Sequence, residues 1–420
     1  MVPHLTTALS GPLRALEKQI LDAQSKIEQW FRVQWFERTP PFYASVDLRN
    51  SGFKLAPVDT NLFPGGFNNL NPEFHALCVQ AAQAAVERIC PDARRLLLVP
   101  ENHTRNVFYL QNVAALSRIL RQAGLEVRIG SLLPEIATTT TLTLPDGDTL
   151  ILEPIHREGR RVRLADYNPC MVLLNNDLSA GVPDVLAGAE QPVVPPLAAG
   201  WATRRKSHHF RHYDRVAGDF ARLIGIDPWL VNPYFDTCGE INFRERKGEE
   251  CLAAHVEELL ERIRLKYAEY GIDEVPFVIV KADAGTYGMA IMTVKDAAEV
   301  RTLNRDARKK MAVAKEGLSV TEVIIQEGVY TFESINEAVA EPVVYMMDRF
   351  VVGGFYRVHT GRGRDENLNS PGMHFIPLAF ESHGAYPDTG AAPGAAPNRF
   401  YTYGVVARMA LLAAAMELET

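Results

Sequence analysis

The spacing of hydrophobic residues predicts that helices and strands alternate along most of the chain. Apolar residues that recur every three or four positions, with capping residues near the ends, predict helices over residues 13–37, 71–89, 104–123, 207–224, 249–270, 296–314 and 401–417. Short apolar runs rich in β-branched residues predict strands over residues 95–99, 125–129, 170–174, 277–280, 289–294, 321–329, 342–347 and 351–358. The pattern therefore indicates an α/β protein with α+β regions.

Residues 95–129 show the order strand, helix, strand, which joins parallel strands. We therefore expect a parallel sheet in the N-terminal half, with ligands beyond the carboxyl ends of its strands. The loop after the first strand carries Arg105, a candidate contact for an anion. A stretch rich in proline and alanine, Glu190 to Gly200, indicates a boundary between two domains. We expect an amphipathic helix in residues 1–40 and two domains, in residues 41–200 and 201–420.

Composition narrows the class of protein. A chain of 420 residues, 47% of them hydrophobic, can build two or three globular domains. Its net charge of −7 argues against nucleic-acid or membrane partners, and the basic segment 201–215 is more simply a solvated helix face. Five scattered cysteines without CxxC spacing, no signal-like segment and no apolar run of membrane length favour a cytoplasmic protein.

The segment Phe42 to Leu70 concentrates polar side chains that are costly to bury without partners. One interpretation is a structured loop, because Asp and Asn favour turns. The other is a pocket for a small zwitterion, in which a carboxylate meets Arg49 or Lys54 and an ammonium meets Asp47 or Asp59. With Arg105, the candidate substrate-binding residues are Asp47, Arg49, Asn50, Lys54, Asp59, Asn61, Asn68 and Asn69.

A second stretch, VPFVIVKADAGTYGMAIMTV over residues 275–294, has the features of a phosphate-binding hairpin. Its first strand delivers Lys281 to a loop bracketed by Gly285 and Gly288, and glycines let backbone N–H groups approach an anion. An ordinary hairpin with a surface lysine is the alternative. Lys206 stands where a helix begins, with Ser207 as its expected cap, so an anion would also be favoured there.

Several motifs in order resemble the ATP-grasp carboxylate-amine ligases: Lys206 before a helix, then VKADAGTYGMAI, IIQEGV, VVGGFYRV and ENLNSPG. Within that superfamily, VDLRNSGFKLAPVDTNLFPGGFNNL, PENHTRN and VVGGFYRVHT are similar to a bacterial class of glutamate-cysteine ligases over essentially the whole chain. The resemblance implies that residues 41–200 form an α/β substrate-binding domain of the kind that precedes an ATP-grasp domain, and that residues 201–420 form the ATP-grasp catalytic domain. It also implies ATP-dependent joining of glutamate to cysteine through a γ-glutamyl phosphate, the first step of glutathione synthesis.

The resemblance also implies roles for individual residues. Lys206 and Lys281 would contact ATP phosphates, Lys281 and Arg357 would be catalytic, and Gln326 with Glu327 would form the adenine-ribose hinge. Gly285, Thr286, Tyr287 and Gly288 would form a lid loop over the phosphates. The candidate ligands of Mg²⁺ are Glu341, Glu366, Asn367 and Asn369.

Other functions stay open at this point. Another ATP-grasp ligase with different amino-acid substrates, or an ATP-binding sensor without catalysis, would fit the same motifs. The chain shows no GxxxxGK[ST], GxSxG or HExxH string, so P-loop ATPases, α/β-hydrolases and zincin proteases lack support. The partners expected are glutamate, cysteine and ATP. The sequence leaves open whether the protein forms a homo-oligomer.

Overall fold

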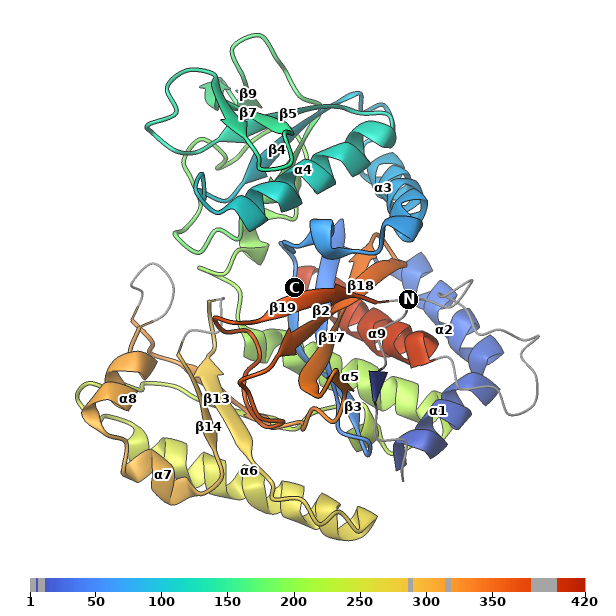
Figure 1. Ribbon diagram of the computed structural model, residues 1–420, viewed down its shortest axis with the longest axis vertical. Coiled ribbons are helices and arrows are strands. Elements are labelled where there is room, and N and C mark those ends of the chain that lie inside the picture. Colours follow the sequence, from blue (N-terminus) through green and yellow to red (C-terminus); the bar gives the residue numbers. More distant parts are fainter. Residues whose placement is uncertain (1–4, 7–11, 286–289, 314–318, 379–398, 420) are drawn as a thin grey trace.

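The computed structural model describes residues 5–6, 12–285, 290–313, 319–378 and 399–419. Three sheets with their helices make up most of this part of the chain (Figure 1). The α/β class expected from the sequence is confirmed. Smaller elements are the hairpin β8 (His156–Glu158) with β9 (Arg161–Arg163), and the 3₁₀ turns η1 (Phe67–Asn69), η2 (Pro72–Phe74), η3 (Leu197–Ala199) and η4 (Pro228–Leu230).

The parallel sheet expected around residues 95–129 is present. Its strand order is β11-β10-β4-β5-β7-β6, and only the β6–β7 pair is antiparallel. Helix α4 (Val107–Gln122) connects β4 to β5, and α3 (His75–Ile89) packs on α4. The strands are β4 (Arg95–Pro100), β5 (Glu126–Ser131), β6 (Thr140–Thr143), β7 (Thr149–Pro154), β10 (Met171–Asn175) and β11 (Val193–Val194).

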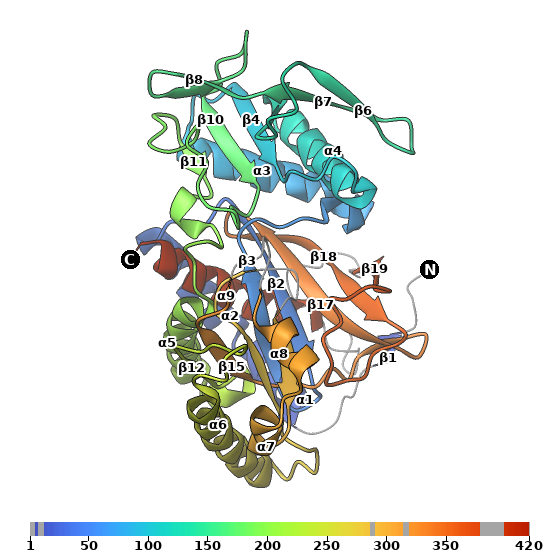
Figure 2. The same ribbon diagram turned by 90° about the vertical axis from the view of Figure 1, so that its left-hand side faces the viewer.

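A larger sheet joins the two ends of the chain. It runs β1-β16-β17-β18-β19, with β2 paired to β17 and β3 paired to β2. Helix α3 also contacts β17 and β18, so it lies at the junction between this sheet and the parallel sheet (Figure 2). The strands are β1 (Leu5–Thr6), β2 (Tyr43–Asn50), β3 (Leu55–Asn61), β16 (Ser334–Ile335), β17 (Ala338–Met347), β18 (Phe350–His359) and β19 (His374–Pro377).

Strands β2 and β3 were not expected, because residues 42–70 were interpreted as a structured loop or as a ligand pocket without regular strands. Ala44, Val46 and Leu48 alternate with polar residues along β2 and are fully buried. A strand with one apolar and one polar face gives this pattern. The polar face of β2 belongs to the site described below.

Helices cover the larger sheet on the side of these apolar residues. Helix α9 (Arg399–Leu418) is almost wholly buried and packs on α5 (Lys206–Ile224), β2 and β3. The continuous helix expected over residues 13–37 is wrong, because a turn at Ala23, with ψ of 6°, divides it into α1 (Pro12–Asp22) and α2 (Gln24–Glu37). Both helices direct apolar residues into the same core.

The third sheet is antiparallel, in the order β12-β15-β13-β14, and α6 (Glu249–Tyr270) packs on it over the range expected. Its strands are β12 (Phe235–Cys238), β13 (Val278–Ala282), β14 (Ile291–Val294) and β15 (Val323–Glu327). The single helix expected over residues 296–314 is wrong: Asn304 accepts a bond from the Ala307 amide and starts a new helix. The result is α7 (Ala297–Arg301) and α8 (Arg305–Met311), with Ala314 outside the described residues.

The domain boundaries expected at residues 40 and 200 stay a prediction. Strand pairing shows that residues 43–61 belong to the same sheet as residues 338–377, while residues 95–194 form the parallel sheet. Within the described ranges, no helix combines the length and the apolar character needed to cross a bilayer.

Candidate active site

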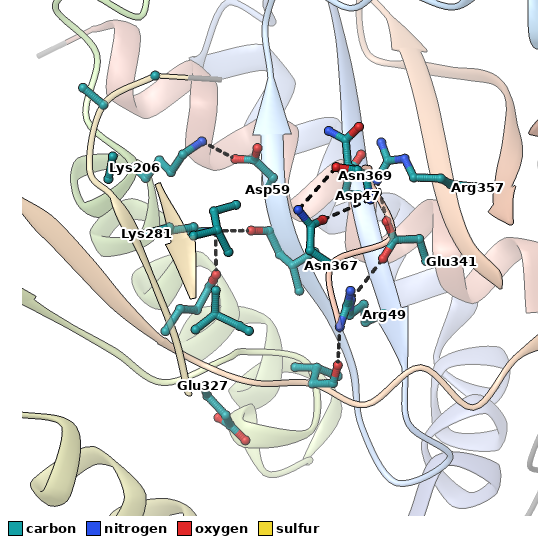
Figure 3. A pocket seen from close by; sticks show the side chains of 18 residues that line it. Asp47, Arg49, Asp59, Lys206, Lys281, Glu327, Glu341, Arg357, Asn367 and Asn369 are labelled. Atoms are coloured by element: carbon teal, nitrogen blue, oxygen red, sulfur yellow. Dashed lines mark hydrogen bonds and ion pairs between the residues drawn. The ribbon is translucent and has the colours of Figure 1, made fainter. Parts of the chain in front are cut away.

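A polar cavity lies between the larger sheet and the antiparallel sheet (Figure 3). The larger sheet supplies Asp47, Arg49, Asp59, Glu341 and Arg357, while the antiparallel sheet supplies Lys281 and Gln326. We call it the first cavity; it is also lined by Val58, Lys206, Ile279, Ala282, Ala284, Gly285, Ile291, Glu327, Val329, Asn367 and Asn369.

Two lysines enter the first cavity from different elements. Lys281 Nζ donates hydrogen bonds to the Val58 carbonyl and to Gln326 Oε1, both at 2.8 Å. Burial lowers the pKa of Lys281 to about 8. Lys206 Nζ donates to Asp59 Oδ1 at 2.9 Å and lies 4.0 Å from the centre of the Trp201 ring. Both ammonium groups are therefore held in place at the cavity wall.

The start of α5 is closed by a protein carboxylate. The helix begins at Lys206 after Arg205, so the expectation that Ser207 caps it is wrong. Instead, the amide and the hydroxyl of Ser207 donate to the two oxygens of Asp283, at 2.7 and 2.6 Å. Asp283 thus supplies the negative charge that a helix N-terminus favours, and Lys206 faces the cavity through its side chain alone.

Carboxylates and arginines alternate on the cavity face of β2, β17 and β18. Glu341 lies opposite Arg357 in the β17–β18 pair and accepts hydrogen bonds from Arg357 and, at 3.0 Å, from Arg49 Nε. Arg357 also donates to Asp47 at 2.9 Å. Arg49 donates further to the carbonyls of Val329 and Glu366, at 3.3 and 2.6 Å.

Burial and the neighbouring charges shift the pKa values of Asp47 and Asp59. Burial raises the pKa of Asp47 above its usual value; Glu341 and Asp59 add to this rise, while Arg357 opposes it. For Asp59 burial acts in the same direction, but Lys206 and Lys281 outweigh it and hold the pKa well below the usual range. Asp59 is therefore a fixed negative charge, whereas Asp47 is the more easily protonated of the two.

A second cavity adjoins the first on the side of the parallel sheet. Four residues, which we call the border residues, line both cavities: Asp47, Asp59, Arg357 and Asn369. The other residues that line the second cavity are Ser45, Asn61, Phe63, Gly65, Gly66, Asn68, Asn69, Glu101, Asn106, Phe108, Tyr109, Asn112, Asn175, Asp177, Trp201, Val343, Tyr345, Phe355, Met373 and Phe375.

The structure divides the substrate-binding candidates into two groups. Asp47, Arg49 and Asp59 line the first cavity, and Asn61, Asn68 and Asn69 line the second. Three candidates line neither: Asn50 bonds Glu333 and Tyr403 in the core, Lys54 pairs with Glu327 in the interior, and Arg105 is exposed on its loop.

The two candidates for the adenine-ribose hinge, Gln326 and Glu327, differ in whether their polar atoms already have partners. The Glu327 carboxylate accepts hydrogen bonds from Lys54 at 2.7 Å, from Trp229 at 3.0 Å and from the Tyr234 amide at 2.9 Å. These donors occupy both of its oxygens. Gln326 is 2% exposed, and its Nε2 has no partner among the described residues, so it keeps a free donor in the first cavity.

Part of the expected lid loop can be placed. Gly285 lines the first cavity with φ of +100°, a backbone conformation that favours glycine. Thr286, Tyr287 and Gly288 lie outside the described residues.

The expected metal ligands do not gather around one point. Glu341 is shared by two arginines, and Glu366 accepts from the Gly363 amide and from Arg362 instead of lining the first cavity. Asn367 and Asn369 do line it. In the ranges that the structure describes, no three His, Cys, Asp or Glu side chains form a metal-binding group. A divalent ion would fit here only with most of its ligands supplied by a bound anion and water.

Several lining residues were missed from the sequence. Trp201, Tyr109, Asn112, Tyr345 and Phe355 come from separate elements that only the fold brings together. The period-2 pattern of β17 could have indicated the inward side of Val343 and Tyr345, because Asp47 and Ser45 face them across the strand pair.

The chain is similar to known proteins over nearly its whole length. The family model described as GshA, glutamate-cysteine ligase, matches residues 17–418. A search of the curated proteins finds no match. A crystal structure of a protein from Methylobacillus flagellatus KT, provisionally assigned as a gamma-glutamylcysteine synthetase, is 69% identical in sequence and has a TM-score of 0.93. The match covers 100% of this chain and 99% of that chain.

Two more distant structures resemble the chain weakly. D-alanyl-alanine synthetase A from Vibrio cholerae is 11% identical, with a TM-score of 0.35 over 76% of this chain and 81% of its own. A glutathione synthetase-like effector from Globodera pallida is 9% identical, with a TM-score of 0.40 over 86% of this chain and 82% of its own. At such TM-scores neither likeness supports an argument.

Proposed function

Since this chain belongs to the glutamate-cysteine ligase family, we propose that it joins the γ-carboxyl group of L-glutamate to the amine of L-cysteine. ATP drives the reaction and forms ADP and phosphate through a γ-glutamyl phosphate. The product is γ-glutamylcysteine, the precursor of glutathione. The protein is a ligase, and its substrates are small molecules.

The observation that supports this proposal most directly is the pair of adjoining cavities. The first carries the ammonium groups of Lys206 and Lys281 and the guanidinium groups of Arg49 and Arg357. The second is rich in amide and aromatic side chains. Because the border residues line both, a phosphoryl group in the first cavity and an amino acid in the second would meet at that border.

The chemistry explains why cations are needed at this border. A carboxylate is a poor electrophile, so its oxygen must first become a leaving group, and transfer of the ATP γ-phosphate does this. The charge on the transferred phosphate must be neutralised, and the groups must be held in line. Lys206, Lys281 and Arg357 are the side chains that we assign to this task.

We place the nucleotide base where the antiparallel sheet and Val329 line the first cavity. Ile279 and Val329 offer apolar contacts there, and the free Nε2 of Gln326 can donate to a base nitrogen or a phosphate oxygen. In this proposal the antiparallel and larger sheets hold ATP between them as an ATP-grasp domain, with Gly285 in the loop over the phosphates.

Mg²⁺ is the divalent ion that we expect with ATP. Asn367 and Asn369 are the side chains that we assign to it, because both line the first cavity; Asn367 Oδ1 also accepts a hydrogen bond from the Asn369 amide at 3.0 Å. When bound with the nucleotide, the ion would neutralise phosphate charge. Glu341 and Glu366 would act indirectly, by holding the arginines and the loop around residues 362–366.

Glutamate is the substrate that we place near Arg49 and Arg357. Its γ-carboxylate must reach the γ-phosphate, and the guanidinium groups of Arg49, in the first cavity, and Arg357, at the border, would attract its two carboxylates. The cytoplasmic location is also proposed, in line with five cysteines that are all free. A homo-oligomer stays a prediction.

The proposal is tested by ADP release from the purified protein with Mg-ATP and glutamate, cysteine or both, with the thiol product identified by mass. We expect ADP in step with γ-glutamylcysteine when both amino acids are present. Turnover with other amino acids alone would indicate a different ligase. ATP binding without turnover in any combination would favour the sensor.

A further inference from the structure

Asp47 and Asp59 face each other directly across the β2–β3 pair. Both side chains line both cavities, so the two carboxylates flank the passage between them. Like charges directly opposite on neighbouring strands destabilise a sheet. Each carboxylate has one protein cation on one of its oxygens, Arg357 on Asp47 and Lys206 on Asp59, and a positively charged ligand between the two carboxylates would contact their other oxygens.

A second observation indicates a ligand at the same place. Arg357, 8% exposed, donates to Asp47 and Glu341 through NH1, while its buried Nε has no partner among the described residues. An unused buried donor is costly, and a ligand oxygen at the border would satisfy it. The border thus offers negative charge to an ammonium and a donor to an oxygen.

The wall beyond the aspartates is apolar. Val343 lies opposite Asp47, and Phe355 lies opposite Val343, so one row of side chains runs from Asp59 through Asp47 to Val343 and Phe355. The Phe355 ring centre lies 4.8 Å from that of Phe375. A short, uncharged, polarisable side chain suits such a wall.

The charge of the second cavity also selects between the two amino acids. Its described lining has four carboxylates, those of Asp47, Asp59, Glu101 and Asp177, and one guanidinium, Arg357; Lys206, from the first cavity, adds one positive charge by pairing with Asp59. Glutamate carries a net negative charge and would be repelled. Cysteine is neutral overall and brings an ammonium group.

We propose that the second cavity binds the acceptor amino acid, cysteine, with its amine between Asp47 and Asp59, and that Asp47 accepts the proton which the amine must lose. This inference rests on the ligase function proposed above. It assigns different tasks to the two carboxylates: Asp59, fixed by Lys206, holds the ammonium, and Asp47 is the base. Their opposite pKa shifts agree with this division.

The cysteine nitrogen loses two protons as the amide bond forms. The ammonium gives one proton to the Asp47 carboxylate, and the freed lone pair forms a C–N bond to the γ-carbonyl carbon of γ-glutamyl phosphate. The bond from that carbon to the phosphate oxygen breaks, and the leaving phosphate takes a second proton from nitrogen. Asp47 then returns its proton to solvent.

Hydroxylamine separates this step from formation of the acyl phosphate, because it is unprotonated at neutral pH and needs no base. The test compares γ-glutamylcysteine and γ-glutamylhydroxamate formed by wild type and Asp47→Asn. A general base contributes about 10²–10⁴-fold, so we expect the ratio of hydroxamate to γ-glutamylcysteine to rise about 100-fold or more in the variant. An unchanged ratio would overturn the inference.

Asp348→Asn is the matched control. Asp348 is also a buried aspartate paired with an arginine, Arg88 at 3.1 Å, but it lies at the β17–β18 turn, outside both cavities. We expect this variant to keep the wild-type product ratio even if its thermal midpoint falls. A ratio that rises equally in both variants would show a general effect of losing a buried carboxylate and would also count against Asp47.

Val343→Phe tests the location of the acceptor independently of Asp47. The added ring would occupy the wall where we place the thiol side chain, whereas hydroxylamine has no side chain to displace. We expect the KM for cysteine to rise about tenfold, the equivalent of about 1.4 kcal/mol, without a matching rise in the KM for hydroxylamine. Equal rises in the KM for cysteine and the KM for hydroxylamine would show that cysteine binds elsewhere.

The wild-type reaction distinguishes failure of this inference from failure of the proposed function. If wild type makes no γ-glutamylcysteine, both fall. If wild type makes it and Asp47→Asn lowers both products in parallel, only the inference about Asp47 falls.

Discussion

Lys281 and Gln326 are joined across the β13–β15 pair by a 2.8 Å hydrogen bond from the lysine Nζ to the amide oxygen. The Val58 carbonyl accepts a second bond from the same ammonium group. Two acceptors from different sheets therefore fix the charge at the cavity wall before any ligand binds. Preorganised charge of this kind is what phosphoryl transfer requires.

Lys281→Met should remove this charge while keeping most of the side-chain volume. Loss of one preorganised group typically lowers turnover by about 10²–10³-fold, and we expect a fall of that size in ADP formation. The far-ultraviolet circular dichroism should stay unchanged. Lys18→Ala, at an exposed lysine of α1, is the control for loss of a positive charge. Normal turnover in Lys281→Met would remove this lysine from the mechanism.

The pH dependence of ATP binding should follow the acidity of Lys281. Its pKa is lowered to about 8, so the side chain is charged below pH 8 and loses its proton above it. A phosphate prefers the charged form, and the KM for ATP should therefore rise as the pH goes from 7 to 9.5. In Lys281→Arg the guanidinium stays charged over this range, so that rise should disappear. If Lys281 does not contact ATP, steady-state kinetics will show the same pH dependence of the KM for ATP in wild type and in Lys281→Arg.

The lowered pKa of Lys281 also makes the stability of the protein depend on pH. A lysine in a surface salt bridge has a raised pKa and stabilises the fold less as the pH rises, whereas Lys281 should show the opposite trend. Between about pH 8 and the unfolded value near 10.4, the unfolded chain binds more protons at this lysine than the folded chain. The contribution of Lys281 to the free energy of unfolding should therefore increase with pH in this window. Urea denaturation of wild type and Lys281→Met at pH 7.5 and 9.5 measures the difference.

Arg49→Ala should affect glutamate more than ATP. A hydrogen bond to a charged group contributes about 1.5–3 kcal/mol, so we expect the KM for glutamate to rise at least about tenfold and the KM for ATP to change little. The variant should also lose stability, because Glu341 keeps only one of its two arginines. Equal changes in both KM values would place the glutamate pocket elsewhere.

Lys54→Met tests whether Lys54 supports the fold or binds substrate. Lys54 and Glu327 are each 1% exposed and lie 2.7 Å apart, so removal of the cation leaves a buried charge at a cost of about 3–5 kcal/mol. Adding Glu327→Gln should restore part of that loss, as measured by urea denaturation. Unchanged stability with a raised glutamate KM would return Lys54 to the substrate site.

Removal of divalent ions should stop the reaction without unfolding the protein. No three acidic, histidine or cysteine side chains in the described residues form a metal group, so the ion should arrive with the nucleotide. We expect EDTA to abolish ADP formation, Mg²⁺ to restore it, and the thermal midpoint without ATP to stay the same. A stoichiometric metal in the ATP-free protein would contradict this.

The sequence predicted what local periodicity determines. Helix α6 matches its expected range because its apolar stripe, its acidic first turn and Gly271 at its end all lie within one segment. The parallel order of β4 and β5 followed from the helix between them. The two-lysine cavity followed from the family resemblance.

What the sequence concealed depends on contacts between distant segments. Nothing near Lys54 shows that its partner is Glu327, 273 positions away. The polar residues of β2 gave the correct impression of a site, yet only the knowledge that this segment is a strand separates Asp47 and Arg49, on its cavity face, from Asn50, which points into the core. A side chain's partner decides its role, and partners are set by the whole fold.

The pairing of distant strands in the larger sheet also determines when the active site can form during synthesis of the chain. Asp47 and Arg357, which meet at the border, are separated by 310 positions, and Arg49 and Glu341 by 292. Pairings of such high contact order form late, because a long loop must close first. A nascent chain therefore holds β2 and β3 without their partner strand until β17 has left the ribosome. Incomplete chains cannot assemble the border, so a truncated translation product would have no means of consuming ATP there.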